Sequence, residues 1–145
     1  MKTYKIYTAG KMSGLSYSDQ INWRLQLENA VRNRTNRHVI FTHPPHYYRY
    51  GEGLHQTERE AMTWDLNQIR DSDIVVVRLD DIGDSVGTHM ELGFIEAINQ
   101  MGNHHIYVIG VGQPNIEHPW LNEVLFRREK TMQDAAEYIS AYLLQ

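Results

Sequence analysis

Hydrophobic residues along the chain follow two alternating patterns, short continuous runs that predict β-strands and spaced positions that predict amphipathic helices. The clearest strand pattern is DIVVVRL (73–79), a continuous apolar run suited to the middle of a parallel sheet. Runs of β-branched and aromatic residues predict four further strands, at 4–10, 38–43, 104–112 and near 124–126.

Helix starts are marked by a hydroxyl side chain with an acidic residue three positions later, the pattern of a capping box. The pairs are Ser16 with Asp19, Thr57 with Glu60, and Thr131 with Asp134. The first two helices are each expected to bury one apolar stripe, formed by Ile21, Leu25 and Val31 in the first and by Ala61, Met62, Leu66 and Ile69 in the second. The first helix is expected to fade near Asn36, and another to span 86–101.

The alternation of strands and helices predicts an α/β fold, a doubly wound parallel sheet of five strands with helices on both faces. We expect one Rossmann-like or flavodoxin-like domain over residues 1–145. Pro44 and Pro45 are expected to end the second strand and begin an aromatic loop, 44–53. Ligands of such sheets bind beyond the carboxyl ends of the strands. Attention therefore falls on residues 8–14, 43–53, 80–87 and 110–115.

Composition narrows the class of protein. The 145 residues carry a net charge of -4 without a dense Lys/Arg block, so we expect no binding to duplex nucleic acid or to an anionic membrane. The absence of cysteine excludes disulfides and thiolate chemistry, and it suits a reducing compartment. No signal-peptide core and no apolar run of about 20 residues is present. We expect a cytoplasmic protein.

Two carboxylates interrupt apolar stripes. Glu91 lies three and four residues before Phe94 and Ile95, and Asp65 lies among the apolar positions of its own helix. An unpaired carboxylate in a core costs several kcal/mol, so each acid must be bonded or must border a cavity. Either the stripes are narrower than drawn and the acids bind nearby amides, or both acids line one pocket at the strand ends.

The pocket interpretation suits glycosidic chemistry. Glu91 falls in the first turns of its helix, where the macrodipole favours an anion by roughly 0.3–1 kcal/mol and would keep a nucleophile ionised. Asp65 lacks that help and would hold a proton more easily. Enzymes that cleave glycosidic bonds usually use two carboxyl groups in contrasting environments as their catalytic groups. Ser13 and Gly87 lie in loops that fit a sugar or sugar phosphate, and no dinucleotide or P-loop motif is present.

Three segments resemble the nucleoside 2-deoxyribosyltransferase family and its nucleoside 5'-monophosphate N-glycosidase relatives. They are YTAGKMSG (7–14), WDLNQIRDSDIVVVRLD (64–80) and DSVGTHMELGFIEA (84–97). The resemblance covers roughly residues 4–112. It implies the same α/β fold, a small nucleoside or nucleotide substrate, a homodimer or larger assembly, and no metal or organic cofactor.

The resemblance also implies roles for single residues. Glu91 would be the nucleophile that attacks the anomeric carbon, Tyr7 would orient its carboxylate, and Asp65 would assist the departing base. Gly10 and Met12 would border the base and the sugar. Together with Ser13, Ser85 and Gly87, they form the expected substrate-binding set.

Ser85 bears on the nature of the 5' group. In the resembled family, transferases acting on free nucleosides have an aspartate there for the 5'-hydroxyl, whereas relatives acting on 5'-monophosphates have a serine. The neighbouring Asp84 would restore the transferase arrangement after a one-residue shift of the loop, and His89 replaces a glycine of the phosphate-binding relatives. Both substrate classes therefore stay open, with Ser85 favouring the monophosphate.

Other candidate groups have weaker patterns. His43 and His46 have a metal-like spacing, but the two prolines between them oppose a shared metal site. An aromatic set could stack a nucleobase as a lid or simply pack at the surface, and it consists of Tyr47, Tyr48, Tyr50 and Trp64. Trp120 and Asn122 lie in a segment that faces the neighbouring subunit in the resembled family.

The expected function is a retaining double displacement, in which Glu91 attacks C1' and the glycosyl ester then passes to water or to another nucleobase. One alternative is a non-catalytic nucleotide sensor with the same pocket. Another is a structural or interaction domain, because a fold does not by itself specify a function.

Overall fold

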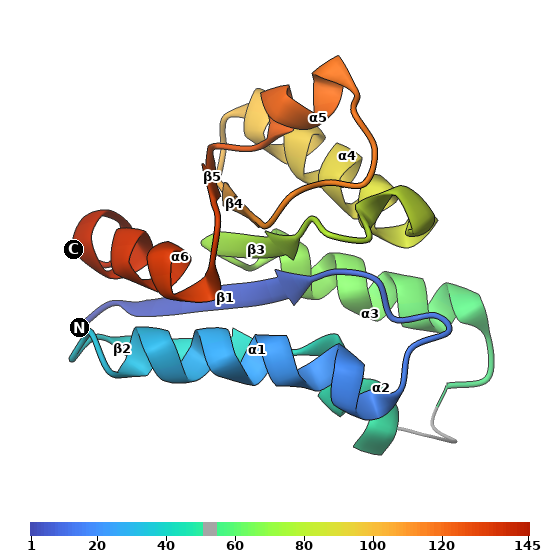
Figure 1. Ribbon diagram of the computed structural model, residues 1–145, viewed down its shortest axis with the longest axis horizontal. Helices are drawn as coiled ribbons and strands as arrows, with labels where there is room; N and C mark the ends of the chain where they lie inside the picture. The colour runs from blue at the N-terminus through green and yellow to red at the C-terminus, as the bar shows by residue number, and fades with distance from the viewer. Residues whose placement is uncertain (51–54) are drawn as a thin grey trace.

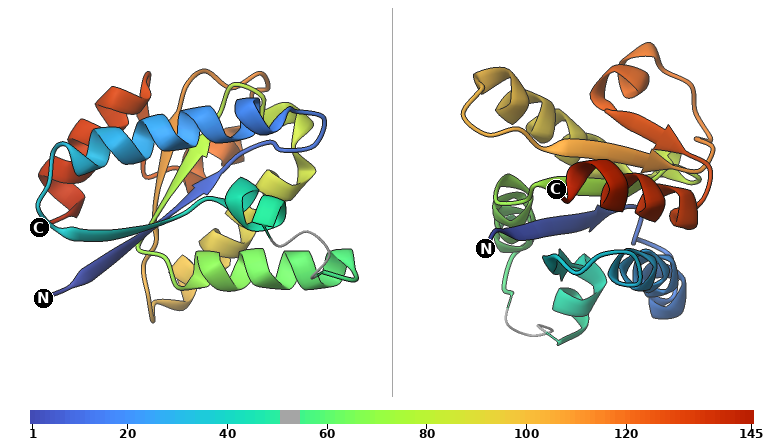
Figure 2. Two further views of the ribbon diagram at one scale, coloured as in Figure 1. Left: turned by 90° about the horizontal axis from the view of Figure 1, so that it is seen from below. Right: turned by 90° about the vertical axis from the view of Figure 1, so that its left-hand side faces the viewer.

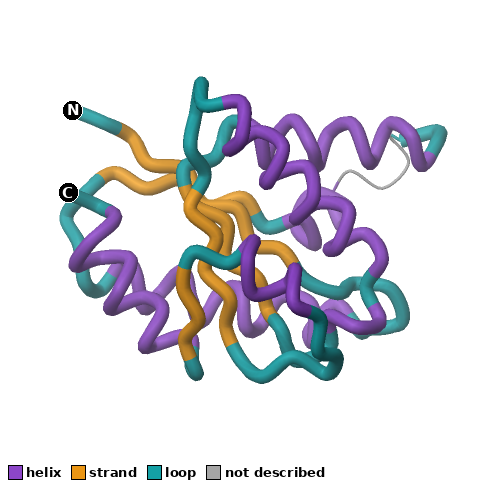
Figure 3. Tube along the Cα trace, turned by 90° about the horizontal axis from the view of Figure 1, so that it is seen from above, coloured by secondary structure: helices purple, strands orange, loops and turns teal. Residues whose placement is uncertain are grey.

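The strands form one parallel sheet in the computed structural model, which describes residues 1–50 and 55–145. Within those residues the sheet has five strands in the order β2-β1-β3-β4-β5 (Figures 1 and 3). Their bounds are Thr3–Ala9 for β1, His38–Thr42 for β2, Ile74–Arg78 for β3, Tyr107–Val111 for β4 and Arg127–Glu129 for β5. The predicted doubly wound fold is confirmed, with the flavodoxin-like strand order.

The helices begin where the sequence places their caps. The Ser16, Thr57 and Thr131 hydroxyls each accept a hydrogen bond from the backbone N–H three residues later. The α-helices are α1 (Tyr17–Arg32), α2 (Pro44–Tyr50), α3 (Glu58–Arg70), α4 (Val86–Met101), α5 (Pro119–Val124) and α6 (Met132–Tyr138). A 3-10 turn (Ile82–Asp84) precedes α4, and a π-helical turn (Ile139–Leu143) follows α6. The expected helix at 86–101 agrees with α4 at both ends.

Two layers of helices cover the sheet (Figure 2). α1 and α6 pack on one face, and α3 and α4 pack on the other. Along β1, Ile6 belongs to the first hydrophobic cluster and Tyr7 to the second, because successive residues of a strand point to opposite faces. Thr8 therefore faces α1, whereas Tyr7 faces α3 and α4.

Two expectations about secondary structure were wrong in this part of the chain. Residues 44–50 form α2 instead of a loop, because proline is tolerated in the first turn of a helix, where its missing N–H leaves no bond unmade. The last strand is 127–129 instead of 124–126, because His118 caps a short helix that begins at Pro119 and ends at Val124. The remainder of the predicted loop, 51–53, lies outside the described residues.

The buried face of the first helix was also predicted wrongly. Leu25 is 36% exposed, while Trp23 and Leu27 are buried in its place, so the buried face is rotated from the predicted one. The helix ends at Arg32, ahead of the expected Asn36.

The strand order brings two loops together at one edge of the sheet. β1 lies between β2 and β3, so the connections that leave β1 and β3 depart toward opposite sides of the sheet. Such a switch in direction opens a crevice at the carboxyl ends of the strands, where doubly wound proteins bind ligands. No helix among the described residues combines the length and apolar character that a membrane crossing needs.

Candidate active site

A cavity of about 1360 Å³ opens beside the carboxyl ends of β1 and β3. Its walls come from the loop after β1, from α2, from α3 and the residues just before it, and from the loop before α4 and the N-terminal half of that helix. Seven of the eight predicted site residues line it, namely Gly10, Met12, Ser13, Asp65, Ser85, Gly87 and Glu91. The eighth, Tyr7, is 1% exposed and lies behind the wall.

Glu91 and Tyr7 are in direct contact. The Tyr7 hydroxyl donates a hydrogen bond of 2.9 Å to Glu91 Oε2. Tyr7 points toward α4 because it alternates with Ile6 along β1, and Glu91 is one turn beyond the start of α4 on the same side of the sheet. The structure thus places Glu91 at the cavity, with a phenol from β1 bound to one of its carboxyl oxygens.

Asp65 is held from a different element. The Tyr48 hydroxyl of α2 donates a hydrogen bond of 2.6 Å to Asp65 Oδ2. Oδ1 of the same carboxyl group is buried and has no hydrogen-bond partner among the described residues. Asp65 thus lines the cavity and keeps one buried oxygen without a hydrogen-bond partner.

The site shifts the pKa of both carboxyl groups upward. Burial raises the pKa of Glu91 to about 7, and the charge of Asp65 adds to that rise, whereas the Tyr7 hydrogen bond and Arg24 oppose it. Burial raises the pKa of Asp65 to about 6, against the effects of Tyr48, His55 and Arg24. Desolvation raises the pKa of both carboxyl groups by more than the roughly 0.3–1 kcal/mol that the helix macrodipole contributes at Glu91, so the macrodipole does not set the ionisation of this pair.

The two tyrosines remain proton donors. Burial, followed by the charge of Glu91, raises the pKa of Tyr7 well above its ordinary value. Burial and the hydrogen bond to Asp65 raise the pKa of Tyr48. Both phenols are therefore protonated at neutral pH and donate to the carboxyl groups.

The loop before α4 offers both of the 5'-group ligands considered from the sequence. Asp84 and Ser85 both line the cavity. Ser85 Oγ lies 2.6 Å from Thr88 Oγ1, and Asn115 donates to Asp84 Oδ2 at 3.3 Å. At Gly87 an added Cβ would meet no atom within 4 Å, so the backbone there is open to a ligand.

Gly10 is closely packed at the opposite wall. A Cβ at this position would lie 3.0 Å from the Trp23 ring and 3.6 Å from Arg24 Nη2. The chain can pass between Trp23 and the cavity because residue 10 has no side chain.

The aromatic set divides into two groups. Tyr48 lines the cavity and binds Asp65, a role that the sequence did not indicate because α2 was expected to be a loop. Tyr47 and Trp64 stack on one another, with ring centroids 3.6 Å apart and planes 10° apart, and neither lines the cavity. The side chain of Tyr50 lies outside the described residues.

The remaining candidates lie elsewhere. His43 is buried against Thr8 and Glu28, and no group of three or more His, Asp or Glu side chains suited to a metal ion occurs in the described ranges. Trp120 and Asn122 belong to α5, where Trp120 is 76% exposed. The predicted homo-oligomer stays a prediction.

Comparison with known proteins gives matches at the level of structure. No protein-family model matches the chain, and no curated protein sequence matches it. A 2-deoxyribosyltransferase from Bacillus psychrosaccharolyticus superposes with a TM-score of 0.66 at 21% identity, over 92% of this chain and 91% of that one. A conserved protein from Enterococcus faecalis V583 superposes with a TM-score of 0.71 at 14% identity, over 97% of this chain and 99% of that one. The resemblance stated from the motifs is thus confirmed as one of fold, and the chain has the fold of a 2-deoxyribosyltransferase over nearly its whole length.

Proposed function

We propose that this protein cleaves the N-glycosidic bond of a nucleoside or nucleoside 5'-monophosphate through a covalent glycosyl-Glu91 intermediate. One observation carries the proposal: the Glu91 carboxyl group, held by Tyr7, shares a cavity with a second carboxyl group, that of Asp65. The fold shared with a 2-deoxyribosyltransferase supports the same chemistry.

In the first displacement, Glu91 attacks C1' of the sugar. The Tyr7 hydroxyl occupies Oε2, which leaves Oε1 to form the new C1'–O bond. As that bond forms, the bond between C1' and the base nitrogen breaks, and its electron pair leaves with the base. Asp65 supplies a proton to the base and becomes a carboxylate, which the Tyr48 hydroxyl stabilises.

In the second displacement, water or another nucleobase attacks C1' and expels Glu91 as a carboxylate. Asp65 takes the proton that the incoming nucleophile loses, so both acids return to their starting states. Two inversions at C1' give net retention of configuration. No bond in either step requires a metal or an organic cofactor.

The cavity suggests how the substrate is placed. Apolar side chains of α3 and α4 offer a surface for the base, and they are Met62, Leu66 and Phe94. Residues 84–87 are then left for the 5' end of the sugar. Ser85 and the open backbone at Gly87 favour a phosphate, whereas Asp84 favours a free hydroxyl.

A base-release screen tests the proposal. The protein is incubated with ribo- and 2-deoxyribonucleosides and with their 5'-monophosphates, with and without an acceptor base, and free base is measured by chromatography. We expect release from at least one substrate pair, and the preferred member of that pair identifies the 5' group that the loop accepts.

Two variants on α4 make the test specific. Glu91→Ala is expected to lose about 10³-fold or more in kcat, because it removes the nucleophile. Glu96→Ala removes a carboxylate from the same helix, outside the cavity lining, and is expected to retain activity. Wild-type turnover by Glu91→Ala would refute the mechanism, and binding without turnover by the unaltered protein would support a nucleotide sensor instead.

A further inference from the structure

Arg24 is a buried charge with no carboxylate partner. The residue is 0% exposed, and among the described residues it makes no ion pair. Its guanidinium donates instead to neutral oxygens: Nε to Thr8 Oγ1 at 3.2 Å, Nη2 to the Gly10 carbonyl at 3.3 Å, and Nη1 to the Gln20 carbonyl. Burying an uncompensated cation is costly, so an arginine at this place needs a reason.

The acceptors of Arg24 place it directly behind the proposed site. Gly10 begins the loop that lines the cavity, and Thr8 follows Tyr7 in β1. The guanidinium also lies 4.4 Å from the centre of the Trp23 ring, against which Gly10 is packed. Arg24 thus ties the end of β1 and the start of the cavity loop to α1.

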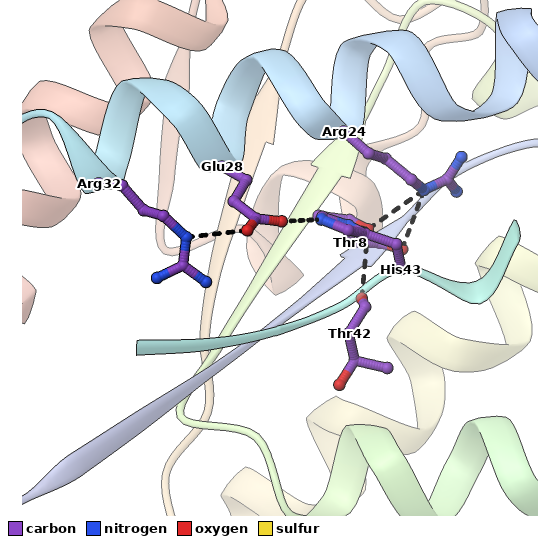
Figure 4. A network of polar contacts seen from close by, with 6 residues as sticks. All are labelled: Thr8, Arg24, Glu28, Arg32, Thr42 and His43. Carbon is purple, nitrogen blue, oxygen red and sulfur yellow. Dashed lines mark hydrogen bonds and ion pairs between the residues drawn. The ribbon is translucent and has the colours of Figure 1, made fainter. Parts of the chain in front are cut away.

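A chain of polar contacts leads away from Arg24 to the surface of α1 (Figure 4). Thr8 Oγ1 lies 2.8 Å from His43 Nδ1, His43 Nε2 lies 2.7 Å from Glu28 Oε1, and Arg32 Nε donates to Glu28 Oε2 at 2.8 Å. Burial lowers the pKa of His43, and the charge of Arg24 contributes in the same direction. His43 is therefore neutral at pH 7, donating from Nε2 to Glu28 and accepting at Nδ1 from the Thr8 hydroxyl.

The protonation states of the residues in this series of polar contacts determine where the charge of Arg24 acts. The charge of Glu28 is balanced by Arg32, with which it forms an ion pair. His43 and Thr8, which lie between Glu28 and Arg24, are neutral. The charges of Arg78 and Asp81 also act on Arg24, in opposite directions, so the polar contacts with α1 leave its positive charge without a directly bonded carboxylate. Burial lowers the pKa of Arg24 to about 10, which still leaves it charged at pH 7.

On the other side of β1 stand the groups that this charge can offset. Glu91 is faced by Tyr7 from β1 and Asp65 from α3, and Tyr48 from α2 binds Asp65. The other charged or titratable side chains of the cavity wall are Lys11, His55, Glu58, Arg59 and Asp84. In the part of the chain that the structure describes, Arg24 is the one buried Arg or Lys.

We propose that Arg24 is a positioning residue of the site: it fixes the Gly10 carbonyl at the cavity loop and supplies, from behind β1, the positive charge that offsets Glu91 and Asp65. This inference rests on the proposed function for its catalytic meaning. The effect of the Arg24 charge on the pKa of the carboxyl groups can be measured without any substrate.

The test is an NMR titration of the Glu91 carboxyl group in the free protein, assigned through Glu91→Gln. Arg24→Gln keeps N–H donors for the carbonyls and removes the charge, so it is expected to raise the pKa of Glu91 above the value in the unaltered protein. Arg24→Lys keeps the charge and is expected to hold the pKa within a few tenths of a unit of the wild-type value. Arg34→Met removes a positive charge from an exposed residue just after α1 and is expected to leave the pKa of Glu91 unchanged.

A second pair of variants leaves Arg24 in place, in case Arg24→Gln does not fold. Thr8→Asp gives Arg24 a carboxylate partner and is expected to raise the pKa of Glu91, whereas Thr8→Asn is not. An unchanged Glu91 pKa in folded Arg24→Gln or in Thr8→Asp would overturn the proposal, and so would equal shifts in the Lys and Gln variants.

Activity gives the second readout and separates this inference from the proposed function. If Glu91 is the nucleophile, Arg24→Gln moves the acid limb of the kcat/KM profile to higher pH by the same shift as the titration, and Arg24→Lys restores the limb. If the protein releases no base but the titration shifts as expected, the proposed function fails while the role of Arg24 as a counter-charge stands.

Discussion

At the scale of single residues, the behaviour of the Glu91 carboxyl group follows from a few neighbours that act in opposite directions. Burial and the charge of Asp65 favour the protonated form, whereas the Tyr7 hydrogen bond and Arg24 favour the ionised form. Attack requires Glu91 ionised and Asp65 protonated, so the active form holds one proton on the pair. Activity therefore rises along an acid limb as Glu91 ionises and falls as Asp65 loses its proton, with apparent pKa values of the pair near 6 and 7.

Opposite shifts of this acid limb are expected from two substitutions. Tyr7→Phe removes a hydrogen bond to the carboxylate and should raise the pKa of Glu91, moving the limb to higher pH. Asp65→Asn removes a neighbouring negative charge and should move the limb to lower pH, although kcat falls because the proton donor is lost. Profiles of kcat/KM against pH measure both, and shifts in the same direction would contradict this account.

The free energy of unfolding should also depend on pH through Glu91. The pKa of Glu91 is raised on folding from 4.5 to about 7, so the folded state binds the proton more tightly than the unfolded state does. The resulting stability is fully present below pH 4.5 and is lost as pH rises through about 7. Glu91→Gln, which cannot ionise, should therefore be more stable than the wild type above pH 7, by about 2–3 kcal/mol.

Urea unfolding at pH 5 and pH 8 measures this difference. The gain should be several times larger at pH 8 than at pH 5, and the Glu96→Gln control should show no such dependence on pH. A gain of equal size at both values would mean that Glu91 is not buried as an acid.

The residues that sequence reasoning found, and those it missed, have a common explanation. Glu91 and Asp65 interrupt apolar stripes, and the structure does place them at one cavity, although their catalytic roles stay predictions. Arg24 interrupts the buried apolar face of α1 in the same way, between Ile21 and Leu27. It was missed because the predicted buried face contained Leu25 instead of its neighbours. Tyr48 could not be found by spacing, because its contact with Asp65 depends on how α2 packs.

At the scale of secondary structure, α3 places Asp65 and depends on its N-terminal cap. The Thr57 side chain accepts from Glu60 N, and the Glu60 carboxylate accepts from the N–H of Thr57, so both halves of the capping box are present. These bonds satisfy N–H groups that otherwise have no partner within the helix.

Thr57→Ala should lower the free energy of unfolding by about 1 kcal/mol, because it removes the cap. Thr63→Ala is the same substitution at an exposed position inside α3 and should be neutral or slightly stabilising, because alanine has the higher helix propensity. Urea denaturation at neutral pH compares the two variants. Equal losses would show that the cap is not the source of the effect.

Elements with strong local signals were predictable, and those decided by context were not. Caps and apolar periodicity located α1, α3, α4 and α6 and the four longer strands. α2 was missed because a pair of prolines serves equally well to end a strand or to begin a helix. β5 was predicted at the wrong residues because Arg127–Glu129 carry no apolar run, although they pair with β4 in the sheet.

At the scale of the whole molecule, alternating strands and helices predicted the fold class. The order of the strands came only from the structure, because the same alternation is compatible with several arrangements of neighbours. That order matters for function, since it sets β1 beside β3 and so brings the loop after β1 against the start of α4.

Ligand binding should stabilise the whole fold. A nucleoside or 5'-monophosphate at 100 times its Kd adds about 2.7 kcal/mol. For a chain of this size the corresponding rise in Tm is about 5–10 °C. Glu91→Gln should keep the rise while losing turnover, so thermal unfolding of both proteins separates binding from catalysis. No rise with any member of the substrate panel would count against the cavity as a nucleotide site.

The opposite orientations of Tyr7 and Thr8 have a consequence for transplanting this chemistry. The two residues are adjacent in β1, yet one serves the cavity and the other serves Arg24. Inserting or deleting a single residue in the strand would exchange them and disable both faces at once. To move this site to another scaffold, a designer would therefore have to transfer β1 with the contacts on both of its faces, those to α1 and those to α4.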